Sequence, residues 1–168
     1  MTPIKYLSLP LLLILLIAGG AWAQSAVADA GNKCQKLDEQ TAALVNEYTE
    51  LREKRHRLPQ GSFDPDLDHE RGRLSRVLSA LGAELGRPVY TKETIVNCLG
   101  APDAVRSQRK MRQFLEIYHR ELRKAGRKVV ERNGREYLIY FWRGWHDFIF
   151  FISEGGVIVD HGWWFAYE

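Results

Sequence analysis

The stretch YLIYFWRGWHDFIFFISEGGVIVDHGWWF, from Tyr137 to Phe165, decides the fold of this 168-residue chain. Twelve of the 19 aromatic residues lie in the last 32 positions, in short runs with Val and Ile that are separated by glycine. Such runs are typical of β-strands. They predict strands at about 136–142, 147–153 and 157–165. The RGWH and EGG turns between them are short enough to require an antiparallel meander.

The two faces of this predicted sheet differ in character, because side chains in a strand alternate between faces. We expect turns that pair Trp142 with Asp147 and Ile152 with Val157. One face is then almost wholly apolar and should lie under the helices; it carries Tyr137, Ile139, Phe141, Phe148, Phe150, Ile152, Val157, Val159, His161 and Trp163. The other face carries Leu138, Tyr140, Trp142, Asp147, Ile149, Phe151, Ile158, Asp160 and Trp164.

The second face mixes aromatic residues with carboxylates, a composition typical of protein-binding surfaces. An antiparallel sheet often leaves one face open to solvent. The alternative is that helices cover this face as well, because the chain has more helix than one face needs. The predicted partner-binding residues are Tyr140, Trp142, Trp145, Asp147, Asp160 and Trp164.

The pairs His146-Asp147 and Asp160-His161 suggest a metal site, but alternation argues against one. Neighbours in a strand point to opposite faces, so the four side chains cannot converge on one ion, and zinc needs three or four protein ligands. No serine lies in a GxSxG context. We therefore expect no metal and no cofactor. Asp147 and Asp160 are predicted to share a face, which leaves open a paired-carboxylate hydrolase or a glycan-binding surface.

The first 23 residues resemble a secretory signal peptide. Lys5 precedes an apolar run from Leu7 to Ala18, and Ala21-Trp22-Ala23 provides a small-x-small cleavage site. The run is about a dozen residues, short of the about 20 that span a bilayer. Cleavage after Ala23 predicts a periplasmic or secreted protein without a membrane span, and an uncleaved anchor is the alternative. Residues 24–33 are predicted to be a flexible tail.

The chain has two cysteines, Cys34 and Cys98. In an oxidising compartment a disulfide between them is the simplest outcome. Two free buried thiols are the alternative.

Four helices are predicted ahead of the meander. Apolar residues at helical spacing place them at about 36–56, from Asp64 to Gly86, over TKETIVNCL with Thr91 as its cap, and from Ala104 to Gly126. A weaker strand is predicted at 127–131. The fold class is α+β, one domain over 34–168, with a helical hairpin at 34–86 and a helix-plus-meander module at 91–168.

Positive charge is concentrated in one segment. Residues 106–135 hold 11 Lys or Arg against three Glu, a net charge of +8, whereas the whole chain carries +3. Nucleic acid is not expected as a partner of an exported protein, so anionic lipid is the natural target. A solvated helix face is the alternative. The predicted anionic-surface residues are Arg109, Arg112, Arg120, Arg123, Lys124 and Arg127.

Two further motifs support a family resemblance. The helix TKETIVNCLGAPD ends in Leu-Gly-x-Pro, and the later strands carry Tyr140-Phe141-Trp142 and a glycine turn before Val157. Over about 91–168 this pattern resembles the SmpA/OmlA envelope proteins and the β-lactamase-inhibitor-protein-like modules. The resemblance implies helices on an antiparallel sheet and a non-enzymatic role in binding proteins. The chain departs from the lipoprotein members because it lacks a lipidated cysteine and inserts a basic helix after LGAPD.

Together these observations predict an exported, non-enzymatic protein-binding or envelope scaffold module. A protein partner is expected, with anionic lipid as a possible second partner. A small secreted hydrolase or ligand-binding domain is the alternative.

Overall fold

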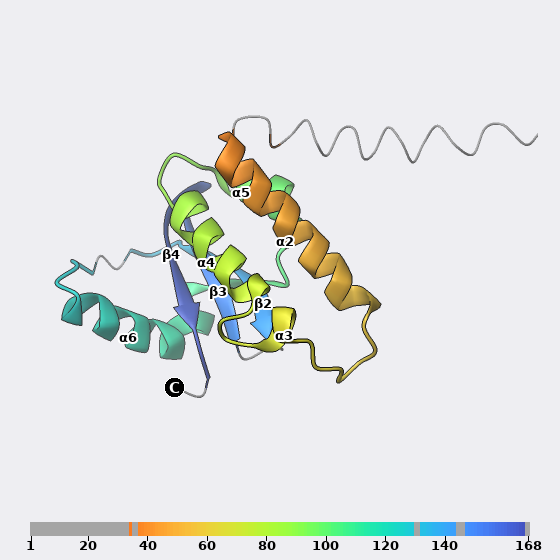
Figure 1. The fold of residues 1–168 in the computed structure, drawn as a ribbon. Helices are drawn as coiled ribbons and strands as arrows, with labels where there is room; N and C mark the ends of the chain where they lie inside the picture. The colour runs from red at the N-terminus through yellow and green to blue at the C-terminus, as the bar shows by residue number, and fades with distance from the viewer. Residues whose placement is uncertain (1–33, 35–36, 130–131, 144–146, 167–168) are drawn as a thin grey trace, which may run out of the picture.

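The structure is a computed structural model that describes residues 34, 37–129, 132–143 and 147–166. The predicted signal peptide, the predicted tail, Trp145 and His146 lie outside the described residues. The α+β prediction is confirmed, because helices pack on a four-stranded antiparallel sheet of order β1-β2-β3-β4. The elements, labelled as in Figure 1, are α2 (Glu39–Arg57), α3 (Pro65–Asp68), α4 (Arg73–Leu85), α5 (Lys92–Leu99), β1 (Ala104–Ser107), α6 (Gln108–Lys124), β2 (Glu136–Arg143), β3 (Asp147–Glu154) and β4 (Val157–Trp164).

The predicted helical hairpin is formed by α2 and α4, which lie side by side (Figure 1). Asp38 begins α2 by accepting a hydrogen bond from the Thr41 amide at 2.8 Å. The second predicted helix is interrupted, however, and its first turn is the separate helix α3. The chain folds back at Gly72 so closely that a Cβ there would lie 2.5 Å from the Pro65 carbonyl oxygen. The sequence signal for α3, Asp64 before Pro65, was therefore correct, but the helix stops after one turn.

The ends of α5 are formed as predicted. The Thr91 hydroxyl accepts a hydrogen bond from the Thr94 amide at 3.2 Å. Gly100 ends the helix with a φ of 79° and a ψ of −177°, a conformation open to glycine alone.

The segment after LGAPD differs from its prediction. Residues 104–107 form the edge strand β1, which pairs with β2 in the register Ala104 to Ile139, and helix α6 starts only at Gln108. The prediction failed because the apolar spacing typical of α6 also extends back over residues 104–107. In the folded protein these residues instead form backbone hydrogen bonds with β2, which the spacing alone could not show. The weak strand expected at 127–131 is absent from residues 127–129, and residues 130–131 lie outside the described part.

A β-bulge in the last hairpin changes the faces that were predicted for β4. Tyr137 pairs with Ile152 and Phe141 with Phe148, so most of β2 and β3 has the expected register. The expected pair of Trp142 with Asp147 was wrong, because the register shifts after Phe141 and Asp147 pairs with Arg143. Between Ile152 and Ser153 the register with β4 shifts by one residue, and Ile152 pairs with Asp160 whereas Ser153 pairs with Ile158. Because a shift of one residue exchanges the two faces of a strand, His161 and Trp163 lie on the face opposite to the one predicted.

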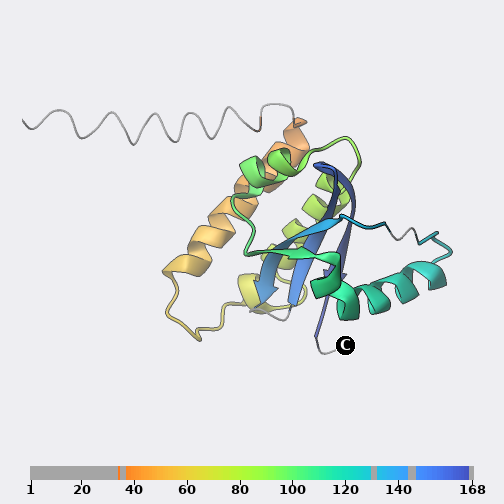
Figure 2. The same cartoon turned by 180° about the vertical axis from the view of Figure 1, so that it is seen from behind.

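Helices cover both faces of the sheet. Helices α2, α4 and α5 lie on one face and α6 lies on the other (Figures 1 and 2). The first face buries Leu138, Tyr140, Trp142, Ile149, Phe151 and Ile158 against the hairpin. The second face buries Tyr137, Ile139, Phe148, Phe150 and Ile152 against Met111 and Leu115 of α6.

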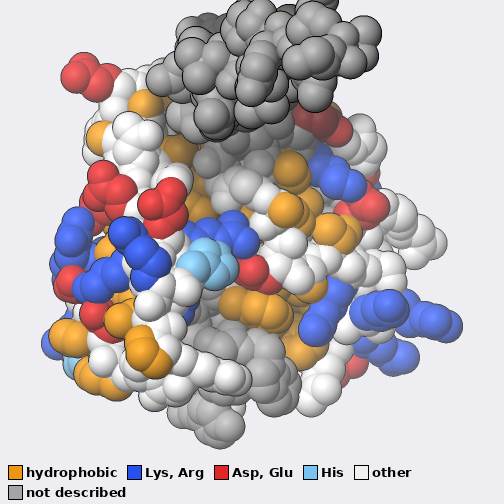
Figure 3. Space-filling model, turned by 90° about the vertical axis from the view of Figure 1, so that its right-hand side faces the viewer, with side chains coloured by type: hydrophobic (Ala, Val, Ile, Leu, Met, Phe, Trp, Pro, Cys, Tyr) orange, Lys and Arg blue, Asp and Glu red, His pale blue; other side chains and the backbone are white. Residues whose placement is uncertain are grey.

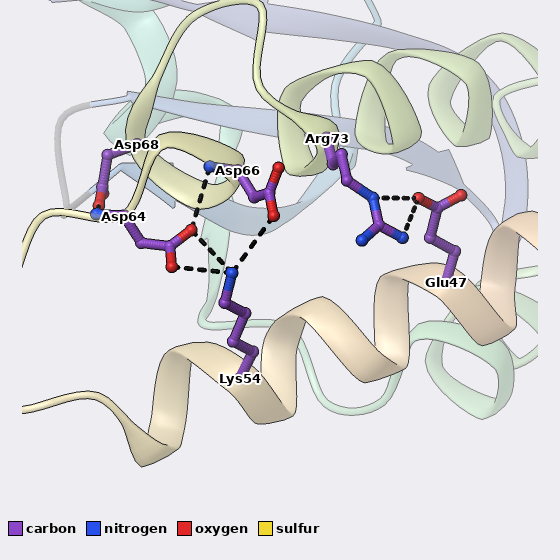
Figure 4. A network of polar contacts seen from close by, with 6 residues as sticks. All are labelled: Glu47, Lys54, Asp64, Asp66, Asp68 and Arg73. Atoms are coloured by element: carbon purple, nitrogen blue, oxygen red, sulfur yellow. Dashed lines mark hydrogen bonds and ion pairs between the residues drawn. The ribbon is translucent and has the colours of Figure 1, made fainter.

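Polar contacts join α2 to α3 and to the start of α4. The Lys54 ammonium lies 2.8 Å from Asp64 Oδ2 and 3.3 Å from Asp66 Oδ2, and Arg73 donates to Glu47 Oε1 from both Nε and its terminal nitrogen (Figure 4). The hydrogen bond from Lys54 holds the pKa of Asp64 below its usual value. The acidic DPDLD segment thus has its counterions within the chain, and they join α2 to α3.

The predicted disulfide between Cys34 and Cys98 is present, with Cα atoms 5.5 Å apart. This separation lies in the normal range for disulfides. It links the segment before α2 to the last turn of α5, across 64 positions of sequence.

Replacing both cysteines by serine should lower the free energy of unfolding by about 2–4 kcal/mol, because a long loop is no longer closed in the unfolded chain. Chemical denaturation of the two forms measures this difference. The variant should keep the far-ultraviolet circular dichroism of the parent. A change below about 0.5 kcal/mol would contradict a stabilising role for the bond.

Candidate functional site

The predicted partner-binding face is covered, which is the alternative that the sequence left open. Tyr140 and Asp147 have no exposed surface and Trp142 is 3% exposed. These three residues therefore cannot meet a partner on the surface of the folded protein. Asp160 and Trp164 lie on the other face, beside α6, because of the bulge. Trp145 lies outside the described residues.

Tyr140 instead connects the two motifs on which the family resemblance depends. Its hydroxyl donates to the Gly100 carbonyl oxygen at 3.0 Å, so the Tyr-Phe-Trp strand is bonded to the end of the LGAPD helix. Arg52 of α2 donates to the Leu99 carbonyl at 2.9 Å and to the Ala101 carbonyl at 3.2 Å. We call this set, Arg52, Tyr140 and the Leu99–Asp103 segment, the LGAPD junction.

Asp103 completes the LGAPD junction. Its carboxylate accepts from the Phe141 amide at 2.7 Å and from Arg52 at 3.3 Å. The motif therefore supplies carbonyl and carboxylate acceptors that join α2, α5 and β2. Burial raises the pKa of Tyr140 and raises the pKa of the neighbouring Tyr48 to about 12, so both phenols stay protonated. Tyr140 donates to Gly100, whereas the Tyr48 oxygen accepts from Arg52 at 3.4 Å.

Asp147 is a structural residue at the start of β3. Arg143 Nε donates to its Oδ2 at 2.7 Å, and the Ala166 amide donates to its Oδ1 at 3.0 Å. The Arg143 guanidinium also lies 4.9 Å from the centre of the Trp142 ring. This carboxylate thus ties the segment after β4 to the start of β3.

The side chains of Asp160 and His161 lie on opposite faces of the sheet, although Tyr118 bonds to both residues. Tyr118 of α6 donates its hydroxyl hydrogen towards Asp160 Oδ2 and the His161 carbonyl, each at 2.9 Å, and Arg127 lies 3.1 Å from Asp160. The His161 ring packs against α4 at Gly82 and Gly86, where an added Cβ would overlap the imidazole. Burial lowers the pKa of His161, Arg127 lowers it further, and Asp160 acts against them.

This geometry removes the paired-carboxylate hypothesis. Asp147 lies on the face of Ile149 and Phe151, whereas Asp160 pairs with Ile152 on the α6 face. The prediction that they share a face was wrong because of the bulge in β4. Within the described part of the chain, no group of three or more His, Cys, Asp or Glu residues has the arrangement of a metal site.

The basic residues of α6 are exposed and lie in two groups, at the start and at the end of the helix. Met111, Leu115 and His119 are buried under the helix, and the opposite side carries residues at spacings of three and four. We call this the basic face; it consists of Arg109, Arg112, Arg120, Arg123 and Lys124. Arg112 is paired with Glu116 at 3.5 Å, while Arg120 and Lys124 share Glu121 at 3.6 and 2.9 Å. Arg109 and Arg123 form no ion pair with any described residue.

The predicted anionic-surface set is thus brought together, apart from Arg127, which is engaged by Asp160. The C-terminal turns of α6 project beyond the β4 edge of the sheet (Figures 1 and 2). The Lys and Arg side chains there are therefore presented away from the rest of the fold.

A cleft that the sequence did not reveal lies between α6 and the turn that precedes β2. It has a volume of about 660 Å³ and is lined by Gln108, Arg109, Arg112, His119, Asn133 and Arg135, among others. The Asn-Gly pair at 133–134 predicted a turn, but nothing in the pattern placed this turn opposite the start of α6. The turn at 133–134 and the first turns of α6 lie opposite each other only because the helix starts at Gln108.

A hollow of about 440 Å³ lies on the α2 side. Tyr48, Phe141 and Trp142 line it together with Arg52 and Arg55. Both arginines are engaged within the chain, Arg52 in the LGAPD junction and Arg55 with Asp68 at 2.7 Å. On this side basic, acidic and hydrophobic side chains are intermixed (Figure 3). It lacks the excess of basic over acidic residues found on α6.

Comparisons with protein-family models, curated proteins and solved structures found no match to this chain. The resemblance to the SmpA/OmlA family therefore stays a prediction. No helix among the described residues is long and apolar enough to cross a membrane.

Replacing Tyr140 by Phe should lower the free energy of unfolding by about 0.5–1.5 kcal/mol, because its hydrogen bond to the Gly100 carbonyl is lost. Thermal or chemical denaturation measures this loss. Tyr90→Phe is the matched control, since the structure shows no hydrogen bond from that hydroxyl within the described residues. Equal losses in the two variants would contradict the role assigned to Tyr140.

The stability of the protein should fall as the pH drops below about 6.5, the value for an unperturbed histidine. The folded state lowers the pKa of His161. The unfolded chain therefore takes up a proton that the folded chain resists, and stability is lost as the pH falls towards the folded pKa. Denaturation between pH 7.5 and pH 5 should show a smaller loss for His161→Gln than for the parent.

Two exposed histidines provide the control for this pH dependence. His56→Gln and His69→Gln should retain the full loss of the parent, since both side chains are exposed. A His161→Gln variant with the same pH dependence as the parent would show that other groups cause it.

Proposed function

We propose that this protein is an exported, non-enzymatic module that attaches to an anionic lipid surface of the cell envelope through the basic face of α6. One observation carries the proposal: α6 buries its apolar side on the sheet and presents exposed cations from its first and last turns on the outer side. The other surface predicted to bind a partner, the sheet face around Tyr140 and Trp142, is covered by helices.

The character of the basic face favours a lipid surface over a protein. Protein interfaces depend on buried aromatic and arginine anchors at their centre. On α6, the aromatic residues Phe114 and Tyr118 pack against the sheet, where they contact Trp164 and Phe150. The large exposed hydrophobic residues among those described are Phe63, Val89, Val105 and Val157, none of which belongs to α6. Exposed cations with no exposed aromatic residue among them suit a diffuse layer of negative headgroups.

The setting in an envelope has independent support. The predicted signal peptide directs the chain out of the cytoplasm, and the disulfide is of the kind that persists in oxidising compartments. The resemblance of residues 91–168 to envelope proteins agrees with both. Attachment would be electrostatic and reversible, because α6 has no apolar side left to insert.

Vesicle binding tests this proposal. The protein should float with vesicles that contain anionic phospholipid and not with neutral vesicles. Replacing Arg120, Arg123 and Lys124 by Gln should lower partitioning about 100-fold, at about 1 kcal/mol per basic residue near the surface. Raising the salt from about 0.1 M to about 1 M should have a similar effect, because the screening length falls to about 3 Å.

The matched control removes the same charge elsewhere. Arg57, Arg71 and Arg76 are exposed residues on the α2–α4 side, and their replacement by Gln should change binding by less than about fivefold. Equal binding to neutral vesicles, or equal losses in both triple variants, would overturn the proposal. Salt-sensitive binding to an acidic protein without binding to anionic vesicles would do the same and would favour a protein partner.

A further inference from the structure

We propose that the cleft between α6 and the turn at residues 133–135 is a binding site for a single phosphate group. The cleft has walls from two elements. Gln108, Arg109 and Arg112 come from the first turns of α6, and Asn133, Gly134 and Arg135 come from the turn before β2. Its volume of about 660 Å³ lies in the range of small-ligand sites. The site deepens the proposed function, because a phosphate is the charged group of an anionic lipid headgroup.

The charges that line the cleft are strongly unbalanced. Three arginines face one carboxylate, Glu116, which lies 3.5 Å from Arg112 in a pair whose side chains are 83% and 69% exposed. Such an exposed pair binds weakly and can be replaced by a ligand at little cost. Arg109 has no ion pair with any described residue. The α6 wall therefore offers two guanidinium groups to an anion.

Arg135 provides a fixed cation on the opposite wall. Its side chain is 12% exposed, and its Nε lies 3.3 Å from Glu154 Oε2. Glu154 is shared with Arg132, whose terminal nitrogen lies 2.8 Å from Oε1. Glu154 thus contacts both guanidinium groups and holds Arg135 in place at the wall of the cleft. Arg135 also lines a second hollow of about 290 Å³, where Lys128 and Arg132 lie together with Glu154 and Asp160.

The positions of the arginines favour phosphate over carboxylate. Guanidinium groups bind both anions through paired hydrogen bonds. The two oxygens of a carboxylate lie in one plane and suit one wall, whereas the oxygens of a phosphate point in several directions and can be met from both walls. Arg109 and Arg112 on one side and Arg135 on the other provide that arrangement.

Gln108 contributes a side-chain amide to the α6 wall of the cleft. Its Oε1 is buried and accepts no hydrogen bond from the described part of the chain. As an acceptor, Oε1 cannot bind an anion, so any contact of Gln108 with a phosphate has to come from its NH2 group, which is a donor.

Phosphate titration of the purified, disulfide-bonded protein tests the site. Inorganic phosphate and glycerol phosphate should shift the amide resonances of Gln108, Asn133 and Gly134 in a saturable way, and acetate at the same ionic strength should not. Replacing Arg109 and Arg112 by Gln should weaken phosphate binding at least about tenfold, as expected for lost hydrogen bonds between charged groups.

The control variant keeps the cleft and removes equal charge. Replacing Arg120 and Arg123 by Gln should change phosphate affinity by less than about threefold, because neither residue lines the cleft. Equal weakening in the two double variants would mean that phosphate follows the general charge of α6, and this would overturn the site. Equal shifts with acetate, or no saturable shift with phosphate, would overturn it as well.

Vesicles distinguish the source of the phosphate and separate this inference from the proposed function. If the Arg109 and Arg112 double variant loses free phosphate and loses more vesicle binding than the Arg120 and Arg123 double variant, the site holds a headgroup. If it loses free phosphate but loses no more vesicle binding than that control, the site holds a soluble phosphate ligand. Vesicle binding without any phosphate binding overturns the site and leaves the proposed function, whereas phosphate binding without vesicle binding overturns the proposed function and leaves the site.

Discussion

The rest of the fold depends on the LGAPD junction, where the carbonyl groups at the end of α5 receive donors from two other elements. A helix that ends inside a protein leaves carbonyls without partners. Here Arg52 and the Tyr140 hydroxyl supply the missing donors, and Gly100 turns the chain so that Asp103 reaches the Phe141 amide. The direction of β1, its pairing with β2 and the placement of α6 all follow from this turn. The disulfide at Cys98 holds the same helix from its other side.

Covering both faces of the sheet has a functional consequence. The aromatic residues that could have served as a binding surface are used to join two helical layers, so any partner must meet the outer surfaces of those layers. The α2 side carries charges that are neutralised within the chain, as between Lys54 and Asp64. The α6 side carries a row of cations with few counterions. The charge asymmetry of the sequence therefore becomes an asymmetry between the two sides of the molecule.

Much of this architecture could be predicted from the sequence, because it depends on local chemistry. Periodicity located the three long strands and the helices, Thr91 and Gly100 marked the ends of α5, and the two cysteines were correctly paired. The faces of β4 could not be predicted, since a bulge at Ile152 depends on how β3 and the turn fit together rather than on any residue type. The start of α6 was missed for a related reason: Ala104–Ser107 becomes a strand only because β2 lies beside it. The candidate cleft depends on that start, and its residues could not have been grouped from sequence alone.

The hydroxyl of Tyr118 has a consequence for the solubility of the fold. β4 is the outermost strand of its sheet, and an outer strand with free backbone groups invites pairing with other chains. Its first residues are already occupied, since the Ile158 amide donates to the Tyr90 carbonyl and Thr91 bridges to Val157. Further along, Asp160 accepts from the His161 amide while Tyr118 donates to the His161 carbonyl. From Val157 to His161, side chains and the loop at Tyr90–Thr91 therefore occupy the outer edge of β4, where another strand would have to pair. This protects the aromatic-rich sheet from edge-to-edge aggregation.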